Sequence, residues 1–310
     1  MHLKQISIII TLLLIVLFSN GSYADDDFSK LVIFGDSLSD TGNLASVRGD
    51  FPFPFFNNRV SNGPIMVDIL AEQLGLEAAP SLHLTGPPQG SNFAVASAKA
   101  AGTGPFDLSV QVQAFLAAFS GNASPTALYL ISIGGNDVRA ASDTASFLGA
   151  FSILRTAADA ITMNIRTLIQ AGAINFLVVY APDIGSIPET RLIAEKLGDS
   201  NFVRQATFKS FLFNLLIKQR LGTIKKNFDV RLTEFRSIPF SEDVVRNASG
   251  LDLVNTDGNC FSSQNFQFTP ACENGANLDR FFYFDEIHPT SVVHQRIGRA
   301  LYALVPMAAE

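Results

Sequence analysis

Short apolar runs alternate along this chain with longer stretches of helical periodicity. The apolar runs predict strands near residues 30 to 35, 128 to 133, 174 to 180 and 229 to 235, with a further candidate near 92 to 96. The longer stretches predict helices over 63 to 75, 108 to 119, 144 to 171, 189 to 221 and 291 to 304. Such alternation is typical of βαβ units, so we predict a mostly parallel, doubly wound α/β sheet.

The composition is consistent with one large globular domain. The chain has 310 residues, of which 47% are hydrophobic, and it contains no internal repeat, low-complexity tract or linker. Residues 241 to 281 are rich in Asn, Asp, Ser and Gly and predict a long functional or capping loop. The net charge of -6 is spread without a basic cluster, which argues against nucleic acid as a partner.

The amino terminus has the pattern of an export signal. Lys4 precedes an apolar run from Ile6 to Phe18, and Ser22-Tyr23-Ala24 offers small residues where signal peptidase needs them. The alternative is an uncleaved anchor, but about 13 apolar residues fall short of the roughly 20 that span a bilayer. We therefore predict that residues 1–24 are a signal peptide cleaved after Ala24, that residues 25–310 form the mature domain, and that the protein is secreted or periplasmic.

Two cysteines, Cys260 and Cys272, lie close together in the polar segment. An even pair in an exported chain predicts one disulfide, which would close a loop over 260–272. A zinc site is the alternative, yet neither cysteine has a CxxC partner or a histidine nearby at ligand spacing. No metal is predicted.

The first predicted strand ends at a serine. In the run from Leu31 to Asn43, the apolar stretch stops at Gly35-Asp36-Ser37 and presents a hydroxyl at the carboxyl end of the strand. Open α/β sheets place their chemistry at that edge. The alternative is an ordinary turn in which Asp or Ser caps the next helix.

Few residues can act as a base near neutral pH. Once His2 leaves with the signal, the histidines are His83, His288 and His294. Asp285 stands three residues before His288, so a sharp turn would let its carboxylate orient the ring toward a nucleophile. Alternatively, Asp285 caps a helix that begins near Pro289, and His288 is a surface residue.

Two further segments offer hydrogen-bond donors for a developing oxyanion. Asn136 follows the strand predicted at 128 to 133, in Gly134-Gly135-Asn136-Asp137, and its amide carries two N–H groups. The alternative is a tight turn that uses Gly and Asn. Gly90 could supply a backbone N–H to the same oxyanion, or it could be a loop glycine.

These motifs stand in the order of the four blocks of the SGNH (GDSL) hydrolases, which the chain resembles over essentially its whole mature length. The matching residues are Gly35-Asp36-Ser37, Gly90 before Asn92-Phe93-Ala94, Gly134-x-Asn136-Asp137 and Asp285-x-x-His288. The resemblance implies a single three-layer α/β/α domain with a flavodoxin-like sheet and no cofactor. It implies Ser37 as nucleophile, His288 as base, Asp285 as its orienting acid, and Ser37, Gly90 and Asn136 as the oxyanion hole. The chain departs from the family after Phe93, where Ala96-Ser97 replaces a frequent Gly-Gly pair.

Further features resemble a bacterial branch with secreted lysophospholipases A and glycerophospholipid:cholesterol acyltransferases. These are Asp40-Thr41-Gly42-Asn43, the export signal and the late cysteine pair. The resemblance implies a lipid ester substrate, with lysophospholipid favoured, and the alternatives are sterol acyl transfer, a general carboxylesterase or an idle binding module. Phe51 to Phe56 and Phe261 to Phe268 could line an acyl groove or make transient contact with a membrane surface, or they could be ordinary core packing.

Overall fold

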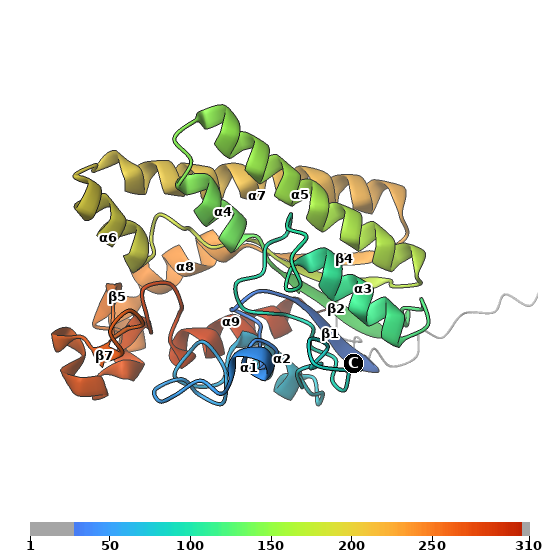
Figure 1. Ribbon diagram of the computed structural model, residues 1–310, viewed down its shortest axis with the longest axis horizontal. Coiled ribbons are helices and arrows are strands. Elements are labelled where there is room, and N and C mark those ends of the chain that lie inside the picture. The colour runs from blue at the N-terminus through green and yellow to red at the C-terminus, as the bar shows by residue number, and fades with distance from the viewer. Residues whose placement is uncertain (1–27, 306–310) are drawn as a thin grey trace, which may run out of the picture.

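The computed structural model describes residues 28–305 of the chain (Figure 1). Its strands are β1 Lys30–Gly35, β2 Ala127–Ser132, β3 Asn175–Val179, β4 Arg231–Phe235, β5 Asn255–Asn259, β6 Phe261–Ser262, β7 Gln267–Phe268 and β8 Phe281–Tyr283. Its helices are α1 Ala45–Arg48, α2 Met66–Gln73, α3 Leu108–Ala118, α4 Gly135–Ser142, α5 Phe147–Gln170, α6 Pro188–Leu197, α7 Asn201–Asn227, α8 Ser237–Arg246 and α9 Ser291–Leu304. Short 3₁₀ turns occupy Ala248–Leu251, Pro270–Gly275 and Leu278–Arg280.

The central sheet is parallel, with the strand order β1-β2-β3-β4. The strand candidate near 92 to 96 is an extended segment on the free edge of β1, reduced to a bridge between Asn92 and Ile33. Phe93 N–H donates to Ile33 O at 2.7 Å, and Val95 N–H donates to Gly35 O at 3.1 Å. When this segment is counted as the second strand of the chain, the strand order is that of a flavodoxin-like sheet.

Side chains alternate along β1 between the two faces of the sheet. Val32 and Phe34 face the larger core, which packs against α3, α4, α5 and α7. Leu31 and Ile33 face a second core, which packs against α2 and α9. Figure 1 shows α5 and α7 above the sheet and α2 and α9 below it, so the domain is a three-layer α/β/α sandwich.

The prediction of one continuous helix over 189 to 221 is wrong. Gly198 adopts φ +64° and ends α6, and α7 then runs from Asn201 to Asn227. Glycine tolerates this left-handed conformation, so it terminates a helix that apolar periodicity alone would continue. Helices α4 and α8 were not predicted from apolar periodicity.

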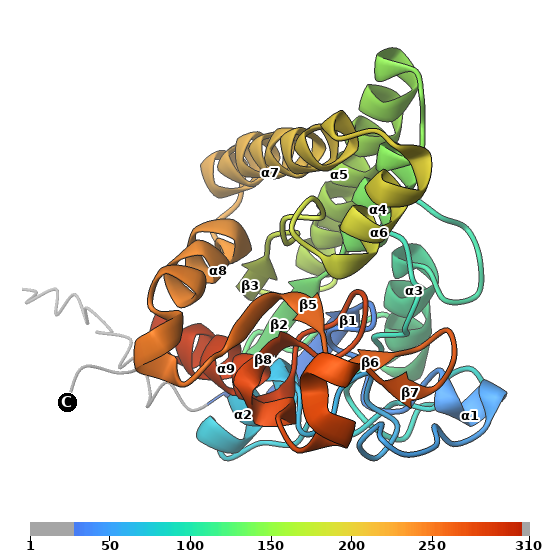
Figure 2. The same ribbon diagram turned by 90° about the vertical axis from the view of Figure 1, so that its left-hand side faces the viewer.

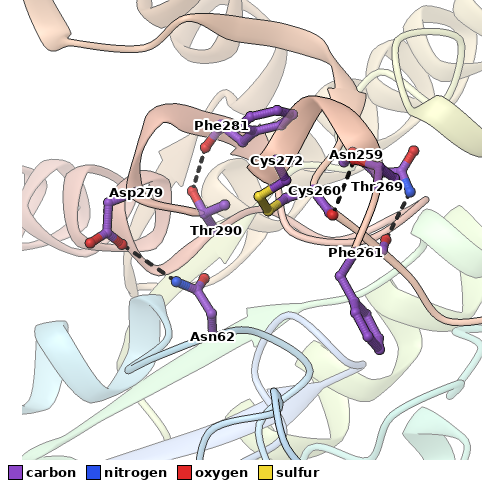
Figure 3. Close-up of a disulfide and its surroundings, with 9 residues drawn as sticks. All are labelled: Asn62, Asn259, Cys260, Phe261, Thr269, Cys272, Asp279, Phe281 and Thr290. Atoms are coloured by element: carbon purple, nitrogen blue, oxygen red, sulfur yellow. Dashed lines mark hydrogen bonds between the residues drawn. A yellow bond between two sulfur atoms is a disulfide. The ribbon is translucent and has the colours of Figure 1, made fainter. Parts of the chain in front are cut away.

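The region predicted as a long loop contains short elements instead. The β6–β7 hairpin lies between Cys260 and Cys272, which form a disulfide (Figure 3). Both cysteines are buried with Phe281 in a small separate cluster, and Thr290 Oγ1 donates to Phe281 O at 2.7 Å. Figure 2 shows the hairpin beside the segment around α1.

The predicted signal peptide lies outside the described residues. Within residues 28–305, no helix combines the length and the apolar character that crossing a membrane requires.

Candidate active site

Three predicted site residues from the two ends of the chain form one hydrogen-bonded relay. Ser37 Oγ lies 2.8 Å from Nε2 of His288, and His288 Nδ1 lies 2.8 and 2.9 Å from the two carboxylate oxygens of Asp285. With the ring proton on Nδ1, His288 donates to Asp285 and accepts from the Ser37 hydroxyl. This arrangement can remove the serine proton as the oxygen attacks an electrophile.

Hydrogen bonds within the turn itself stabilise the backbone from Asp285 to His288. Asp285 Oδ1 accepts the backbone N–H groups of Ile287 at 2.8 Å and His288 at 2.7 Å. Burial alone would raise the pKa of Asp285, but the His288 charge and these hydrogen bonds outweigh burial and lower it. Helix α9 begins later, with Thr290 as its N-cap, so Asp285 does not cap it. His288 is buried rather than a surface residue.

Ser37 is half-buried and lies at the carboxyl end of β1. Buried carboxylates accept hydrogen bonds from the backbone of its turn. Asp36 Oδ1 accepts the Leu38 N–H at 3.1 Å, and burial raises the pKa of Asp36 to about 7. Asp40 accepts backbone N–H groups from the residues that follow it, including Asn43 at 2.7 Å, and from Ala96 of the segment beside β1 at 2.8 Å. Asp36 therefore acts as a structural cap of the serine turn.

Asn136 occupies the first turn of α4, next to the nucleophile. Its Nδ2 donates to Ala98 O at 2.9 Å, and its Oδ1 accepts from Arg139 Nη1 at 3.2 Å. An amide nitrogen carries two hydrogens, so one N–H remains for a ligand. The neighbouring Asp137 has a structural partner, since its carboxylate accepts the Ala100 N–H at 2.8 Å.

The structure contradicts the prediction that Gly90 belongs to the oxyanion hole. Gly90 lies at the amino end of β1, against Lys30 and Leu31. A side chain there would come within 2.2 Å of Ala79 O, so glycine is needed for this close backbone contact. The segment runs parallel to β1 and advances about 3.3 Å per residue, so it reaches the level of Ser37 only several residues after Gly90.

Ser97 is the residue that this segment brings to the site. Ala98 N–H donates to Val95 O at 3.1 Å, and Ser97 takes the third position of that turn with φ +72°. It faces the same groove as Ser37, whereas the Ala96 N–H already donates to Asp40. A left-handed third position usually holds glycine. The departure from the family pattern at Ala96-Ser97, noted in the sequence, was therefore the signal for this position.

Two hollows meet at Ser37, His288, Asn136 and Arg139. The first, which we call the inner cavity, has a volume of about 70 Å³ and is lined mainly by apolar side chains, among them Val179, Ile184, Ile187, Phe235, Phe240 and Phe282. The second, which we call the aromatic groove, has a volume of about 310 Å³ and is lined by Leu44, Phe51, Pro52, Phe55, Val60 and Phe266. A substrate with two arms could extend into both hollows with its reactive centre at Ser37.

The two phenylalanine-rich segments come together beside the aromatic groove. Phe55 makes edge contacts with Phe261 and Phe266, with ring centroids 5.7 and 6.5 Å apart. Phe261 itself is buried, whereas 83% of the Phe53 surface and 57% of the Phe266 surface are exposed. The segments therefore supply both core packing and an exposed aromatic rim.

The other histidines of the described chain have structural partners. His294 is buried, and its Nδ1 accepts the Met66 N–H at 3.2 Å. His83 Nδ1 lies 2.6 Å from Ser81 Oγ. Burial lowers the pKa of His83 to about 4 and that of His294 to about 3, so both rings are neutral at neutral pH. Residues 28–305 contain no group of three His, Cys, Asp or Glu side chains placed to hold a metal ion.

Comparison with known proteins agrees with this architecture. The profile of the family described as GDSL-like Lipase/Acylhydrolase matches residues 31–301. The phosphatidylcholine-sterol acyltransferase of Aeromonas hydrophila is 26% identical over 309 residues, covering 87% of this chain and 88% of that protein. Acetylajmalan esterase 2 of Rauvolfia serpentina is 26% identical over 329 residues, covering 88% and 89%. Lipase 1 of Photorhabdus luminescens is 32% identical over 164 residues, covering 52% of this chain and 23% of that protein.

The chain therefore belongs to the GDSL-like lipase/acylhydrolase family, a family of ester hydrolases. The family match includes the segments that contain Ser37, Asn136, Asp285 and His288.

Proposed function

We infer that this protein is an exported serine esterase that hydrolyses carboxylic esters of lipids, and that lysophospholipids are its substrate class. The observation that carries the inference is the Ser37–His288–Asp285 relay at the junction of the inner cavity and the aromatic groove. A lipid ester is apolar on the acyl side and joins it to a bulkier alcohol, which suits two hollows that meet at the nucleophile.

The reaction proceeds by two acyl transfers. Ser37 Oγ bonds to the carbonyl carbon while its proton passes to Nε2 of His288, and the imidazolium is stabilised by Asp285. The carbonyl oxygen becomes an oxyanion, held by the backbone N–H groups of Ser37 and Ser97 and by the Asn136 amide. The tetrahedral intermediate then collapses, the alcohol leaves with the His288 proton, and water repeats the sequence on the acyl-serine to release the acid.

Acyl transfer to a sterol is the second candidate, favoured by the similarity to the Aeromonas acyltransferase over most of both chains. The two reactions share the acyl-serine and differ in whether water or an alcohol accepts the acyl group. Product analysis with mixed micelles of lysophospholipid, diacyl phospholipid and cholesterol separates them. We expect free fatty acid mainly from lysophospholipid, whereas cholesteryl ester would indicate the transferase.

The same experiment with Ser37→Ala tests the mechanism. We expect this variant to lose both turnover and covalent labelling by an organophosphonate, because only the Ser37 hydroxyl is within hydrogen-bond reach of Nε2 of His288 in the described residues. Labelling that persisted at another serine would end the assignment. If no lipid gave a Ser37-dependent product, the substrate would be an acetyl or carbohydrate ester.

Export and membrane contact belong to the same proposal. Cleavage after Ala24 would deliver the mature enzyme outside the cytoplasm, where mass spectrometry of the exported chain can find its first residue. The exposed Phe53 and Phe266 would make transient contact with a lipid surface at the mouth of the aromatic groove. Weaker sedimentation of Phe53→Ser with phosphatidylcholine vesicles would support this contact, and unchanged sedimentation would contradict it.

A further inference from the structure

Arg139 lies where the inner cavity and the aromatic groove meet, and its guanidinium is bound on two sides. Its Nη1 donates to Oδ1 of Asn136 at 3.2 Å. Its Nε and Nη2 donate to the two carboxylate oxygens of Glu189 at 2.8 and 2.6 Å. The Arg139 and Glu189 side chains are 31% and 26% exposed, so the pair is largely shielded from water. A planar guanidinium held at two of its edges has little freedom to rotate.

Glu189 is fixed in turn to the loop that carries the acid and the base. It lies in the first turn of α6, and its backbone N–H donates to Glu286 O at 2.8 Å. Glu286 is buried, and its Oε2 accepts from the Ser263 N–H at 3.1 Å and from Ser263 Oγ at 2.7 Å. A continuous set of contacts therefore connects Asn136 with the segment between Asp285 and His288.

These contacts select one orientation of the Asn136 amide. A flip of that amide exchanges an oxygen and a nitrogen of similar size, so packing alone selects weakly between the two states. With Oδ1 toward Arg139 and Nδ2 toward Ala98 O, both groups are satisfied. After a flip, the amide NH₂ would face guanidinium donors and the amide oxygen would face a carbonyl oxygen. Arg139 therefore penalises the flipped state.

We propose that Arg139, held by Glu189, is a positioning residue that keeps Nδ2 of Asn136 directed at the oxyanion. The proposal rests on the function proposed above, in which Asn136 donates to the carbonyl oxygen of the substrate. Arg139 acts through Asn136 and touches no reacting atom in this scheme. A residue that acts only in this way changes kcat and leaves KM unaltered.

A double-mutant cycle tests the proposal with a p-nitrophenyl ester as the probe. We expect Asn136→Ala to lower kcat by about 10²–10³-fold. We expect Arg139→Met to lower kcat by roughly ten- to a hundredfold, because small misplacements of a catalytic group have effects of that size. The double variant should match Asn136→Ala within about twofold. Losses that multiply, or a change in KM alone, would overturn the proposal.

Two further variants distinguish a loss of positioning from a loss of folding. Glu189→Gln keeps the length of the side chain but loses its charge and one acceptor oxygen, so we expect a smaller kcat loss that again vanishes in the Asn136→Ala background. Arg220→Met is the matched control, because Arg220 lies on α7, outside both hollows, and its Nε donates to Asp159 of α5 at 2.6 Å. We expect this variant to keep full activity. A Ser37→Ala variant that still turned over substrate would instead refute the proposed function.

Discussion

The two halves of the relay are held in different ways. Around Ser37, the side chains of Asp40 and Asn43 are buried, and their partners Asn92, Ala94 and Ala96 come from a segment about fifty residues further along the chain. Around His288, the acceptors of Asp285 are filled by its near neighbours within one short turn. The nucleophile half is thus built by tertiary contacts, and the acid–base half is built locally.

This difference predicts different consequences of damage. Removing a side chain from the nucleophile half leaves several buried backbone groups without partners, which lowers the stability of the whole domain. Removing the charge from the acid–base half leaves its backbone turn intact and affects chemistry instead. The cluster of Cys260, Cys272 and Phe281 beside β8 is a third and more peripheral set of contacts that stabilises the region of the site.

The largest effect is expected from Asp285→Asn. Asparagine can still accept the backbone N–H groups of the turn, but its amide would donate to Nδ1 of His288 and select the tautomer that cannot accept the Ser37 proton. We expect kcat to fall by about 10⁴ with the melting temperature little changed. Asp252→Asn, which affects only an exposed pair with Arg280, is the control and should keep full activity. A loss below tenfold would contradict the role of Asp285.

Asp36→Asn tests the nucleophile half through pH. Burial raises the pKa of Asp36 to about 7, so between about pH 4 and 7 the folded state keeps a proton that the unfolded chain has lost. The free energy of unfolding therefore falls as pH rises through this range. A difference of about three pH units between the folded and unfolded pKa corresponds to about 4 kcal/mol.

Asparagine mimics the protonated carboxyl and removes this dependence. We expect wild type and Asp36→Asn to be similar near pH 4 and the variant to be more stable by up to about 4 kcal/mol above pH 7. Urea unfolding at pH 4 to 8 measures the difference. Parallel pH profiles for the two proteins would show that Asp36 is ionised in the folded state throughout.

Asn43→Ala should cost about 3 kcal/mol of the free energy of unfolding. Nδ2 of Asn43 donates to Asn92 O and Ala94 O, both at 2.8 Å, and Oδ1 accepts the Leu82 N–H at 2.8 Å. The substitution leaves Ala94 O and the Leu82 N–H without these partners, at roughly 1–3 kcal/mol each before water relieves the part-buried Leu82 N–H, whereas Asn92 O still accepts the Ser81 N–H at 2.7 Å. Asn122→Ala, at an exposed turn, should stay within about 0.5 kcal/mol. Equal values for the two variants would show that the buried contacts of Asn43 do not stabilise the nucleophile half.

The smallest effect is expected from the double variant Cys260→Ser/Cys272→Ser. The disulfide closes the hairpin that carries Phe266 of the aromatic groove and Ser263, the partner of Glu286. We expect KM to rise by a few fold, about 1 kcal/mol, while kcat stays within about twofold. Reduction of the wild type with dithiothreitol should reproduce the change. Unaltered kinetics would show that the disulfide has no role in access to the site.

Local motifs predicted the parts of the site that short segments define. The Gly35-Asp36-Ser37 run and the spacing of Asp285 and His288 placed the relay, because each depends on a strand end or a single turn. The prediction of Gly90 was wrong, since the register of its segment along β1 was invisible in the sequence. Arg139 gave no signal, because its partner Glu189 lies fifty residues away on another helix.

The sequence by itself determined the alternation of strands and helices, the serine at the end of β1 and the acid–base turn, since apolar periodicity and contacts over three residues are properties of short segments. Only the tertiary structure decided which residue of the segment beside β1 lines the same groove as Ser37, and that Arg139, bound to Glu189, contacts Asn136. These depend on strand register and on packing between distant segments. Contacts of this kind join segments that are far apart in the sequence, so they exist only in the folded chain.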